Sequence, residues 1–521
     1  MSDAVHQSVT FNLPGPEYEA VTWIHNEHGS SSSAPLSRTT GSLAPGMMGD
    51  EKPGELPQRI HVNSYSYTRA EHWPPESTLS PHLDDTELPK DDSNLLNWRE
   101  RCLPLVEEVV AELDAFDPGS VVAGGWEDAL TAQQKRISES MRLVHSSAVF
   151  HAQIFAETFA ARYVMEFGHE RQVDGLALLQ GFPNVSTQRA ADLWELGRIA
   201  RRSGAVMSAI ESGALPPGDD ADEVSFRHGF DAAMGKYGHM NPLGAEDLPT
   251  WRENTSMPIS IIWQYAKEND ERSPLVVEQA GIARRKNLEA ELSTMARSSE
   301  AAEDLLKFLP YAQHIGPVTE DHNLLADQRV GNASRARWLK IGEFLRSRGS
   351  VEQSGDVFYY EADELLELME SDAGLGADKL SSRKKQLAHW RTVVPPAVIG
   401  KGALVVDETA NEIVVTGMAA AAGSYTGRAR VIKVLTEASS LVEGDVLVCD
   451  ITTPAWTPYF AVIGAVVTNI GSVLAHGAIV AREFGIPAVV ATGNGTSVIP
   501  DGATVTVNGT EGTVTVVGVR G

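Results

Sequence analysis

Residues 468–490, TNIGSVLAHGAIVAREFGIPAVV, decide the fold of the C-terminal part of the chain. The run GAVVTNI is rich in β-branched residues and predicts a strand that ends in a Gly/Ser turn. This turn delivers His476 to the first turn of a helix over residues 476–484, which Gly485 and Pro487 end. Free backbone N–H groups and the helix dipole favour negative charge there, so a phosphoryl group on the imidazole would be stabilised.

Histidine is also a competent covalent nucleophile near neutral pH, because its neutral form is populated. A histidine that begins a helix and performs no chemistry fits the same spacing about equally well. The residues alone leave both interpretations open.

Short β-branched runs separated by Gly or Asp surround this segment, among them GRARVIKVL, GDVLVCDI, PAVVAT, ATVTVNG and GTVTVVG. They predict a compact β-rich domain over residues 424–521, with the helix of His476 embedded in it. Upstream, residues 391–423 are predicted to be a hinge, since Pro395 and Pro396 stop a basic helix and the stretch GMAAAAGS is small and flexible.

Residues 96–390 show apolar side chains at three and four spacing, as in WRERCLPLVEEVVAELDAF, and predict a mainly helical domain. Its last part, residues 336–370, reads as a helix, a turn with Gly349 as C-cap, a short strand and a helix. Residues 1–95 are rich in Pro, Gly and Ser and predict a loop-rich segment packed on the helical domain. The expected fold class is therefore multidomain α+β.

The composition excludes several classes of function. The 521 residues contain 43 Lys+Arg against 70 Asp+Glu, a net charge of -27, which disfavours binding to nucleic acid or to anionic membranes. The N-terminus lacks the apolar core of a secretory signal, and Cys102 and Cys449 have no zinc or disulfide spacing. A cytoplasmic protein without a metal on this chain is expected.

Three segments in order, residues 423–432, 443–490 and 501–514, resemble the swivelling phosphohistidine domain of phosphoenolpyruvate-utilising enzymes. That family includes pyruvate phosphate dikinase, phosphoenolpyruvate synthase and the rifampicin phosphotransferases. The resemblance implies that His476 is the phosphorylated residue and that Arg482 belongs to the same signature. On an ideal helix Arg482 lies about 240° round from His476, so it either braces the domain or meets a docked partner.

The helical region resembles, more weakly, the substrate domain of the rifampicin phosphotransferases and of the acceptor subunit of phenylphosphate or 4-methylphenyl (p-cresol) phosphate synthase. Residues 230–242, 317–328, 337–349 and 356–369 carry this resemblance. No Gly-rich phosphate loop or ATP-grasp pattern is found, and only a short segment follows His476, so no pyruvate-binding barrel is expected. The resemblance then implies ATP and Mg²⁺ bound mainly by a separate ATP-grasp subunit.

Residues 317–328, PVTEDHNLLADQ, are the first candidate acceptor site. Thr319 is predicted to cap a helix on which the spacing of three and four places Glu320, Asn323 and Asp327 on one face. His322 is the candidate base that takes the proton of the acceptor hydroxyl, because a phenol of pKa about 10 attacks poorly at neutral pH. A solvated acidic helix start explains the same residues about as well.

A second cluster, KYGHMNP, places Lys236 and His239 three residues apart as candidates for phosphate binding. Structural hydrogen bonds are an equally good explanation of both. His145 and His151, six apart in an amphipathic pattern, are expected to be surface or core residues rather than metal ligands.

Taken together, the residues and the resemblance predict the acceptor-binding and phosphocarrier subunit of an ATP-dependent phosphotransferase. The resemblance implies that ATP yields AMP and phosphate while a phenolic hydroxyl, as in phenol or p-cresol, is phosphorylated through His476. Three alternatives stay open. They are a phosphotransferase for a non-phenolic acceptor such as an antibiotic, a phosphocarrier or regulatory protein without its own acceptor, and a structural scaffold.

Overall fold

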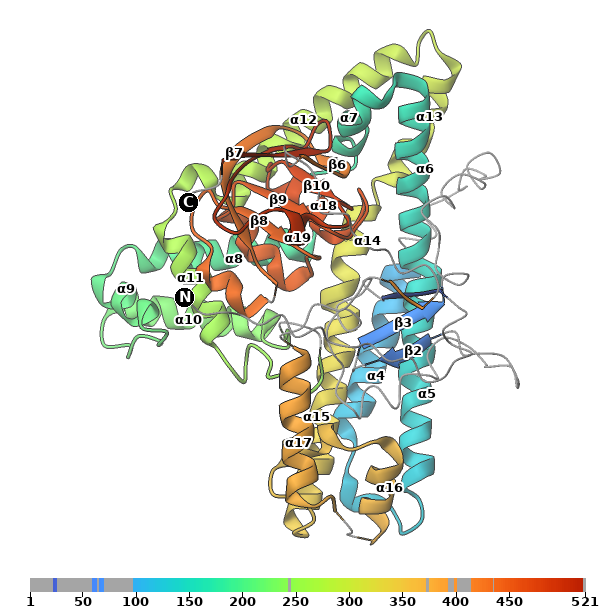
Figure 1. Ribbon diagram of the computed structural model, residues 1–521, viewed down its shortest axis with the longest axis vertical. Helices are drawn as coiled ribbons and strands as arrows, with labels where there is room; N and C mark the ends of the chain where they lie inside the picture. Colours follow the sequence, from blue (N-terminus) through green and yellow to red (C-terminus); the bar gives the residue numbers. More distant parts are fainter. Residues whose placement is uncertain are drawn as a thin grey trace.

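The computed structural model describes residues 22–25, 59–62, 65–69, 97–241, 245–371, 374–391, 398–400, 414–433 and 435–518. A helical domain, residues 98–390, is followed by a sheet domain, residues 414–518, built on an eight-stranded mixed sheet (Figure 1). The predicted α+β fold class is confirmed. Among the helices of the described residues, none combines the length and the apolar character that a membrane span requires.

The α-helices of the helical domain follow the predicted apolar periodicity. They are α4 (Leu103–Ala115), α5 (Trp126–Val144), α6 (Phe150–Phe167), α7 (Gln172–Ala177), α8 (Val185–Ala200), α9 (Gly204–Glu211), α10 (Ala221–Tyr237), α11 (Ser256–Lys267), α12 (Pro274–Met295), α13 (Glu300–Ala312), α14 (Ile315–His322), α15 (Gln328–Ser347), α16 (Ala362–Ser371) and α17 (Ala377–Trp390). In Figure 1, α4, α5, α15 and α17 run side by side away from the sheet domain. The sheet domain lies instead against α8, α11, α12 and α14.

The strands of the sheet domain occur in the spatial order β5-β12-β11-β7-β8-β9-β10-β6. Their bounds are β5 (Val414–Thr416), β6 (Met418–Ala421), β7 (Ser424–Val431), β8 (Val446–Cys449), β9 (Ala465–Thr468), β10 (Ala488–Val490), β11 (Thr504–Asn508) and β12 (Thr513–Gly518). Strands β7 to β10 are parallel, and β8, β9 and β10 are buried along their whole length because both faces are covered. Strand β11 alternates between buried and half-buried residues, so only one of its faces meets the core.

A second, four-stranded antiparallel sheet has the order β2-β3-β1-β4. It joins β1 (Thr22–His25), β2 (Arg59–Val62) and β3 (Tyr65–Arg69) to β4 (Val398–Gly400). Segments of the predicted N-terminal region and of the predicted hinge therefore pair with each other. Most of residues 1–95 lie outside the described residues.

Two local predictions were wrong. Residues Ser354–Tyr359, expected to contain a short strand, form a 3₁₀ helix, because the Asp356 carboxylate accepts the backbone N–H of Gln353 and closes a helical cap. The stretch GMAAAAGS is not a hinge, since β6 pairs with β10 at the sheet edge. A Cβ on Gly417 would lie 2.4 Å from the Val490 carbonyl oxygen, so small residues serve close strand packing there. The rest of the predicted hinge, residues 392–397 and 401–413, is not described.

Gly349 follows the end of α15 with φ +79°, in agreement with its predicted role in ending that helix.

Cys102 and Cys449 are both buried and free of disulfides.

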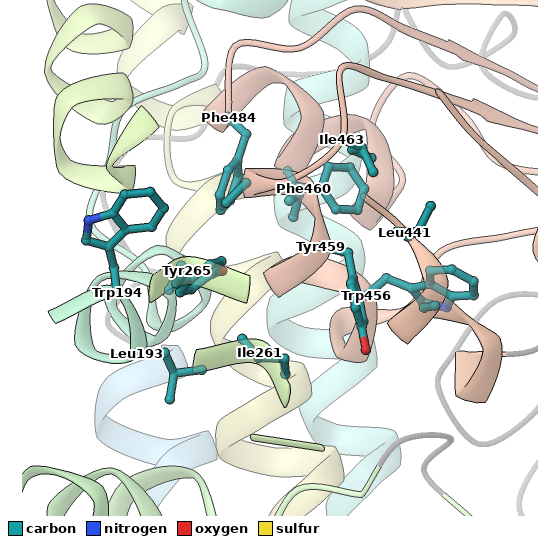
Figure 2. Close-up of a cluster of buried hydrophobic side chains, with 14 of the residues drawn as sticks. Leu193, Trp194, Ile261, Tyr265, Leu441, Trp456, Tyr459, Phe460, Ile463 and Phe484 are labelled. Atoms are coloured by element: carbon teal, nitrogen blue, oxygen red, sulfur yellow. The ribbon is translucent and has the colours of Figure 1, made fainter. Parts of the chain in front are cut away.

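An apolar cluster joins the two domains (Figure 2). The helical domain contributes side chains from α8 and α11, and the sheet domain contributes side chains from the 3₁₀ helix η12 (Pro454–Ala461), its neighbouring loops and the end of α18 (His476–Glu483). The residues labelled in Figure 2 are Leu193, Trp194, Ile261, Tyr265, Leu441, Trp456, Tyr459, Phe460, Ile463 and Phe484. The surface between the domains is therefore packed like a protein interior.

Beside this cluster a buried carboxylate of the sheet domain contacts the helical domain. Glu483, the last residue of α18, accepts the backbone N–H of Gly181 at 3.1 Å. Burial disfavours its charged form and raises the pKa of Glu483 to about 7. The contact between the domains thus includes a group that titrates near neutral pH.

We expect Ile261→Ala to lower the free energy of unfolding by about 2–5 kcal/mol, since the side chain is 1% exposed and its loss leaves a cavity between the domains. Urea denaturation followed by circular dichroism measures this. The matched control is Val224→Ala on α10, which is 41% exposed and should change stability by less than about 0.5 kcal/mol. Equal losses for the two variants would contradict the described packing.

Glu483 should make stability fall as the pH rises. Its folded pKa lies above its unfolded value near 4.5, so the folded state holds a proton that the unfolded state has lost between about pH 4.5 and pH 7. Stability then falls by up to about 3 kcal/mol across this window and is flat above it. Urea midpoints of wild type and Glu483→Gln, measured from about pH 5 to about pH 8, should converge at the acidic end. A constant difference between them would refute this assignment.

Candidate functional site

His476 occupies the first position of α18, at the carboxyl end of the parallel strand β9, as the sequence predicted. The preceding residue, Ala475, caps the helix without a side-chain hydrogen bond, so the first N–H groups of α18 have no such partner. A Cβ on Gly477 would lie 1.9 Å from the Thr452 hydroxyl oxygen, and only glycine lets the helix start approach that loop.

The imidazole of His476 is held on both of its nitrogens. The Oε1 and Oε2 atoms of Glu320 lie 3.0 and 2.9 Å from Nδ1, and the Thr457 hydroxyl lies 3.1 Å from Nε2. A carboxylate only accepts hydrogen bonds, so Nδ1 carries a proton. When the ring is neutral, its lone pair lies on Nε2, where the Thr457 hydroxyl donates. Nε2 is accordingly the ring nitrogen that could act as a nucleophile.

Glu320 comes from α14 of the helical domain and is 2% exposed. Burial alone would raise its pKa, but the charge and hydrogen bond of His476 and a hydrogen bond from Ser186 outweigh burial and hold the pKa of Glu320 below its usual value. The carboxylate therefore stays ionised beside the imidazole. The helical domain thus supplies an anion that orients the histidine of the sheet domain.

A small depression opens beside this pair at the contact between the domains. Its lining comes from the start of α8, from α14, from η12 and from α18, and consists of Asn184, Ser186, Thr187, Glu320, Thr457, Ile479, Val480, Glu483 and Phe484. Polar side chains of the helical domain thus line this depression together with Thr457, the hydroxyl partner of His476.

The other residues of PVTEDHNLLADQ face a different direction. Helix α14 begins at Ile315, so Thr319 lies inside it and does not cap it as predicted. Asn323 is buried in a π-helical turn, η9 (Asn323–Asp327), which breaks the three-and-four spacing expected from a regular helix. Only Glu320 of this segment contacts His476.

His322 and Asp327 gather around His145 instead. The Nε2 atoms of His145 and His322 lie 3.6 and 3.8 Å from the Asp327 carboxylate oxygens. Burial lowers the pKa of His322, whereas the nearby Asp327 carboxylate outweighs burial and raises the pKa of His145 to about 9. The role of His322 as a base stays a prediction.

Lys236 and His239 lie apart from the pair. The Lys236 ammonium is 59% exposed and pairs with Asp192 at 2.8 Å. His239 Nε2 lies 3.0 Å from the Leu324 carbonyl oxygen, and burial lowers the pKa of His239 to about 4. These contacts match the structural alternative to phosphate binding.

Arg482 braces the sheet domain, one of the two roles that its helical position allowed. Its Nη1 donates to the carbonyl oxygens of Ala420 and Val473. The side chain is buried, which lowers the pKa of Arg482 to about 10.

Sequence reasoning missed Thr457, Ser186 and Arg189. Thr457 lies within residues 443–490, one of the segments that carry the resemblance to the phosphohistidine domain. Only the fold shows that its hydroxyl faces His476. Arg189, on α8, is 1% exposed and lies within electrostatic reach of Glu320. No spacing in the sequence relates Ser186 or Arg189 to residues more than a hundred positions away.

Comparisons with known proteins match the two domains separately. Residues 441–512 match the family model of the PEP-utilising enzyme mobile domain, and residues 145–316 match the fourth domain of rifampicin phosphotransferase. A chondramide synthase of Chondromyces crocatus is 28% identical over 460 residues, 80% of this chain and 12% of that protein. A rifampicin phosphotransferase of Bacillus subtilis is 37% identical over 179 residues, 33% and 20% of the two chains.

A phosphoenolpyruvate synthase of Aeropyrum pernix is 48% identical over 104 residues, 20% of this chain and 13% of that protein. The chain spans a fifth or less of the length of these three relatives, and none of the three is named for a phenol. Part of the helical domain is thus similar to the fourth domain of rifampicin phosphotransferase, and most of the sheet domain is similar to the mobile domain of PEP-utilising enzymes.

Proposed function

We propose that this chain carries a phosphoryl group on His476 Nε2 and transfers it to a hydroxyl of a small organic acceptor bound by the helical domain. The contact between His476 and the buried Glu320 carries the proposal. It supports a transfer geometry, because a group of the helical domain touches the ring that would bear the phosphoryl group.

Glu320 would stabilise the imidazole of His476 as the leaving group of this reaction. A phosphohistidine that keeps its Nδ1 proton, held by Glu320, releases a neutral imidazole when the N–P bond breaks and the electron pair returns to Nε2. The acceptor oxygen forms the new O–P bond, and its proton passes to solvent water. Without a partner on Nδ1, that proton would be lost more readily and the leaving group would be an imidazolate, which is far less stable.

Thr457, in the sheet domain, forms a hydrogen bond with His476 Nε2. Its hydroxyl donates to Nε2 in the free histidine and, once Nε2 bears a phosphoryl group, can turn to donate to a phosphoryl oxygen. Because Thr457 travels with His476, this hydrogen bond is kept while the sheet domain moves.

We propose that ATP reacts with His476 when the sheet domain has moved away from the helical domain. His476 is 15% exposed in its contact with Glu320, so a separate ATP-bearing unit reaches it only after the domains part. We propose an ATP-grasp partner that binds ATP with Mg²⁺, phosphorylates His476, and releases AMP and phosphate. Parting exposes the apolar cluster of Figure 2, which the partner would have to cover.

Two acceptor classes remain candidates within this proposal. A phenolic hydroxyl, as in phenol or p-cresol, follows from the resemblance to phenylphosphate synthase, and a hydroxyl of an antibiotic follows from the rifampicin phosphotransferase relatives. The relatives favour the second class. Incubating the phosphorylated chain with phenol, p-cresol and rifampicin, and measuring loss of the phosphoryl group, separates them.

His476→Ala should abolish acid-labile phosphate on the chain, because the nucleophilic nitrogen is removed. The chain is incubated with ATP and its nucleotide-binding partner, or with phosphoramidate, and intact-mass spectrometry detects the added phosphate. His228→Ala, an exposed histidine on α10, is the control and should be labelled like wild type. Equal labelling of the His476 variant would refute the phosphocarrier role.

Glu320→Gln should slow transfer to the acceptor by about 10- to 100-fold while leaving labelling of His476 nearly unchanged, because Glu320 belongs to the helical domain alone. Single-turnover decay of the phosphorylated chain with and without acceptor separates the two steps. Asp192→Asn, whose carboxylate pairs with the distant Lys236, is the control. Equal loss of labelling and of transfer would instead assign Glu320 to the folding of the site.

A further inference from the structure

Three side chains of the helical domain converge outside the pair of His476 and Glu320. His145 begins the π-helical turn η6 (His145–Val149), His322 is the last residue of α14, and Asp327 ends the π-helical turn η9. A π-helical turn brings residues five apart onto one face, which is the spacing of His322 and Asp327. Such turns are found frequently at functional sites.

The distances between these side chains are unusual for direct hydrogen bonds. The Nε2 atoms of His145 and His322 lie 3.6 and 3.8 Å from the two oxygens of Asp327, and the three ligand atoms lie within 4.8 Å of one another. Hydrogen bonds between such atoms span about 2.7–3.2 Å. Two donors that each lie about 2.0–2.2 Å from a shared ion are separated by about the distances seen here.

The other ring nitrogens fix the direction of the donors. Nδ1 of His145 lies 2.8 Å from the Met141 carbonyl oxygen, and Nδ1 of His322 lies 3.3 Å from that of Val318. A carbonyl oxygen only accepts, so each Nδ1 carries a proton, and each ring, once it is neutral, presents its Nε2 lone pair to Asp327. Metal-bound histidines are oriented by the same kind of hydrogen bond on their second nitrogen.

The carboxylate itself lacks a hydrogen-bond donor where the imidazoles meet it. Asp327 Oδ1 is buried without a hydrogen-bond partner. A carboxylate oxygen without a donor and two Nε2 atoms thus face one small volume, and a cation bound there would compensate the negative charge.

We propose that His145, His322 and Asp327 bind a divalent transition-metal ion of the Zn²⁺ type through Nε2, Nε2 and a carboxylate oxygen. Imidazole suits this class of ion, whereas Ca²⁺ and Mg²⁺ prefer ligand sets of oxygen alone. Three protein ligands leave a coordination position for water or for a hydroxyl of a bound molecule. His145 is 32% exposed, which gives the ion a path of entry.

The proposed site departs from the expectation of a chain without metal and of His145 as a surface or core residue, and it stands independently of the proposed function. All three ligands belong to the helical domain, so the position of the sheet domain does not enter the binding. Glu320 lies two residues before His322 on α14, which places the ion close to the candidate acceptor side of the molecule.

The test uses the untagged full chain, stripped with a chelator and titrated with Co²⁺ and then Zn²⁺. We expect one equivalent of Co²⁺ with the visible absorption of a tetrahedral or five-coordinate nitrogen–oxygen site, its displacement by Zn²⁺, and a higher melting temperature with Zn²⁺. Wild type that binds neither ion tightly would overturn the proposal and leave a proton as the cation between the three groups.

Variants locate the site. Asp327→Asn and His322→Ala should each weaken Co²⁺ binding by at least about 10-fold, while His151→Ala, an exposed histidine on the neighbouring helix α6, should bind like wild type. Circular dichroism shows whether each variant is folded, and Asp327→Asn keeps the shape of the side chain if His322→Ala does not fold. Unchanged binding in folded Asp327→Asn would place the ion elsewhere and overturn the assignment.

Discussion

The contact between the His476 imidazole and the Glu320 carboxylate is the interaction on which the arrangement of the two domains depends. Glu320 is buried and ionised, and an isolated buried carboxylate is strongly unfavourable. Its partner comes from the other domain, so the charge is compensated only while the domains touch. When they part, water reaches the carboxylate and replaces the imidazole. Glu320 can therefore stay ionised both while the domains touch and after they part. A carboxylate that stayed enclosed without a partner could not.

Local cations make phosphate chemistry feasible on a chain with a net charge of -27. Arg189 from the helical domain and Arg482 from the sheet domain are both buried, and both act electrostatically on Glu320. They offset part of the negative charge around His476, and the start of α18 adds its own N–H groups. The surrounding acidity is thus countered near the reacting ring rather than over the whole surface.

The cost of separating the domains sets a second constraint. The apolar cluster and Glu483 belong to a surface that is buried in the present arrangement. A carrier that moves must bury that surface against something else or expose it for a time. An ATP-bearing partner that covers the same face would balance the two positions, so the packing of Figure 2 bears on the mechanism as much as on stability.

The sequence by itself determined the α+β class and the strand–turn–helix that carries His476, because each rests on local periodicity and turn residues. It also singled out Glu320, although the helix geometry used to do so was wrong at Thr319 and at the π-helical turn η9. Only the tertiary structure decided that Glu320 faces His476 and that Lys236 and His239 do not. It alone also showed that GMAAAAGS contains a strand and that His145 lies beside His322 and Asp327. These outcomes depend on contacts between segments far apart in the chain and on departures from regular helical spacing, and neither is encoded in the periodicity of any one segment.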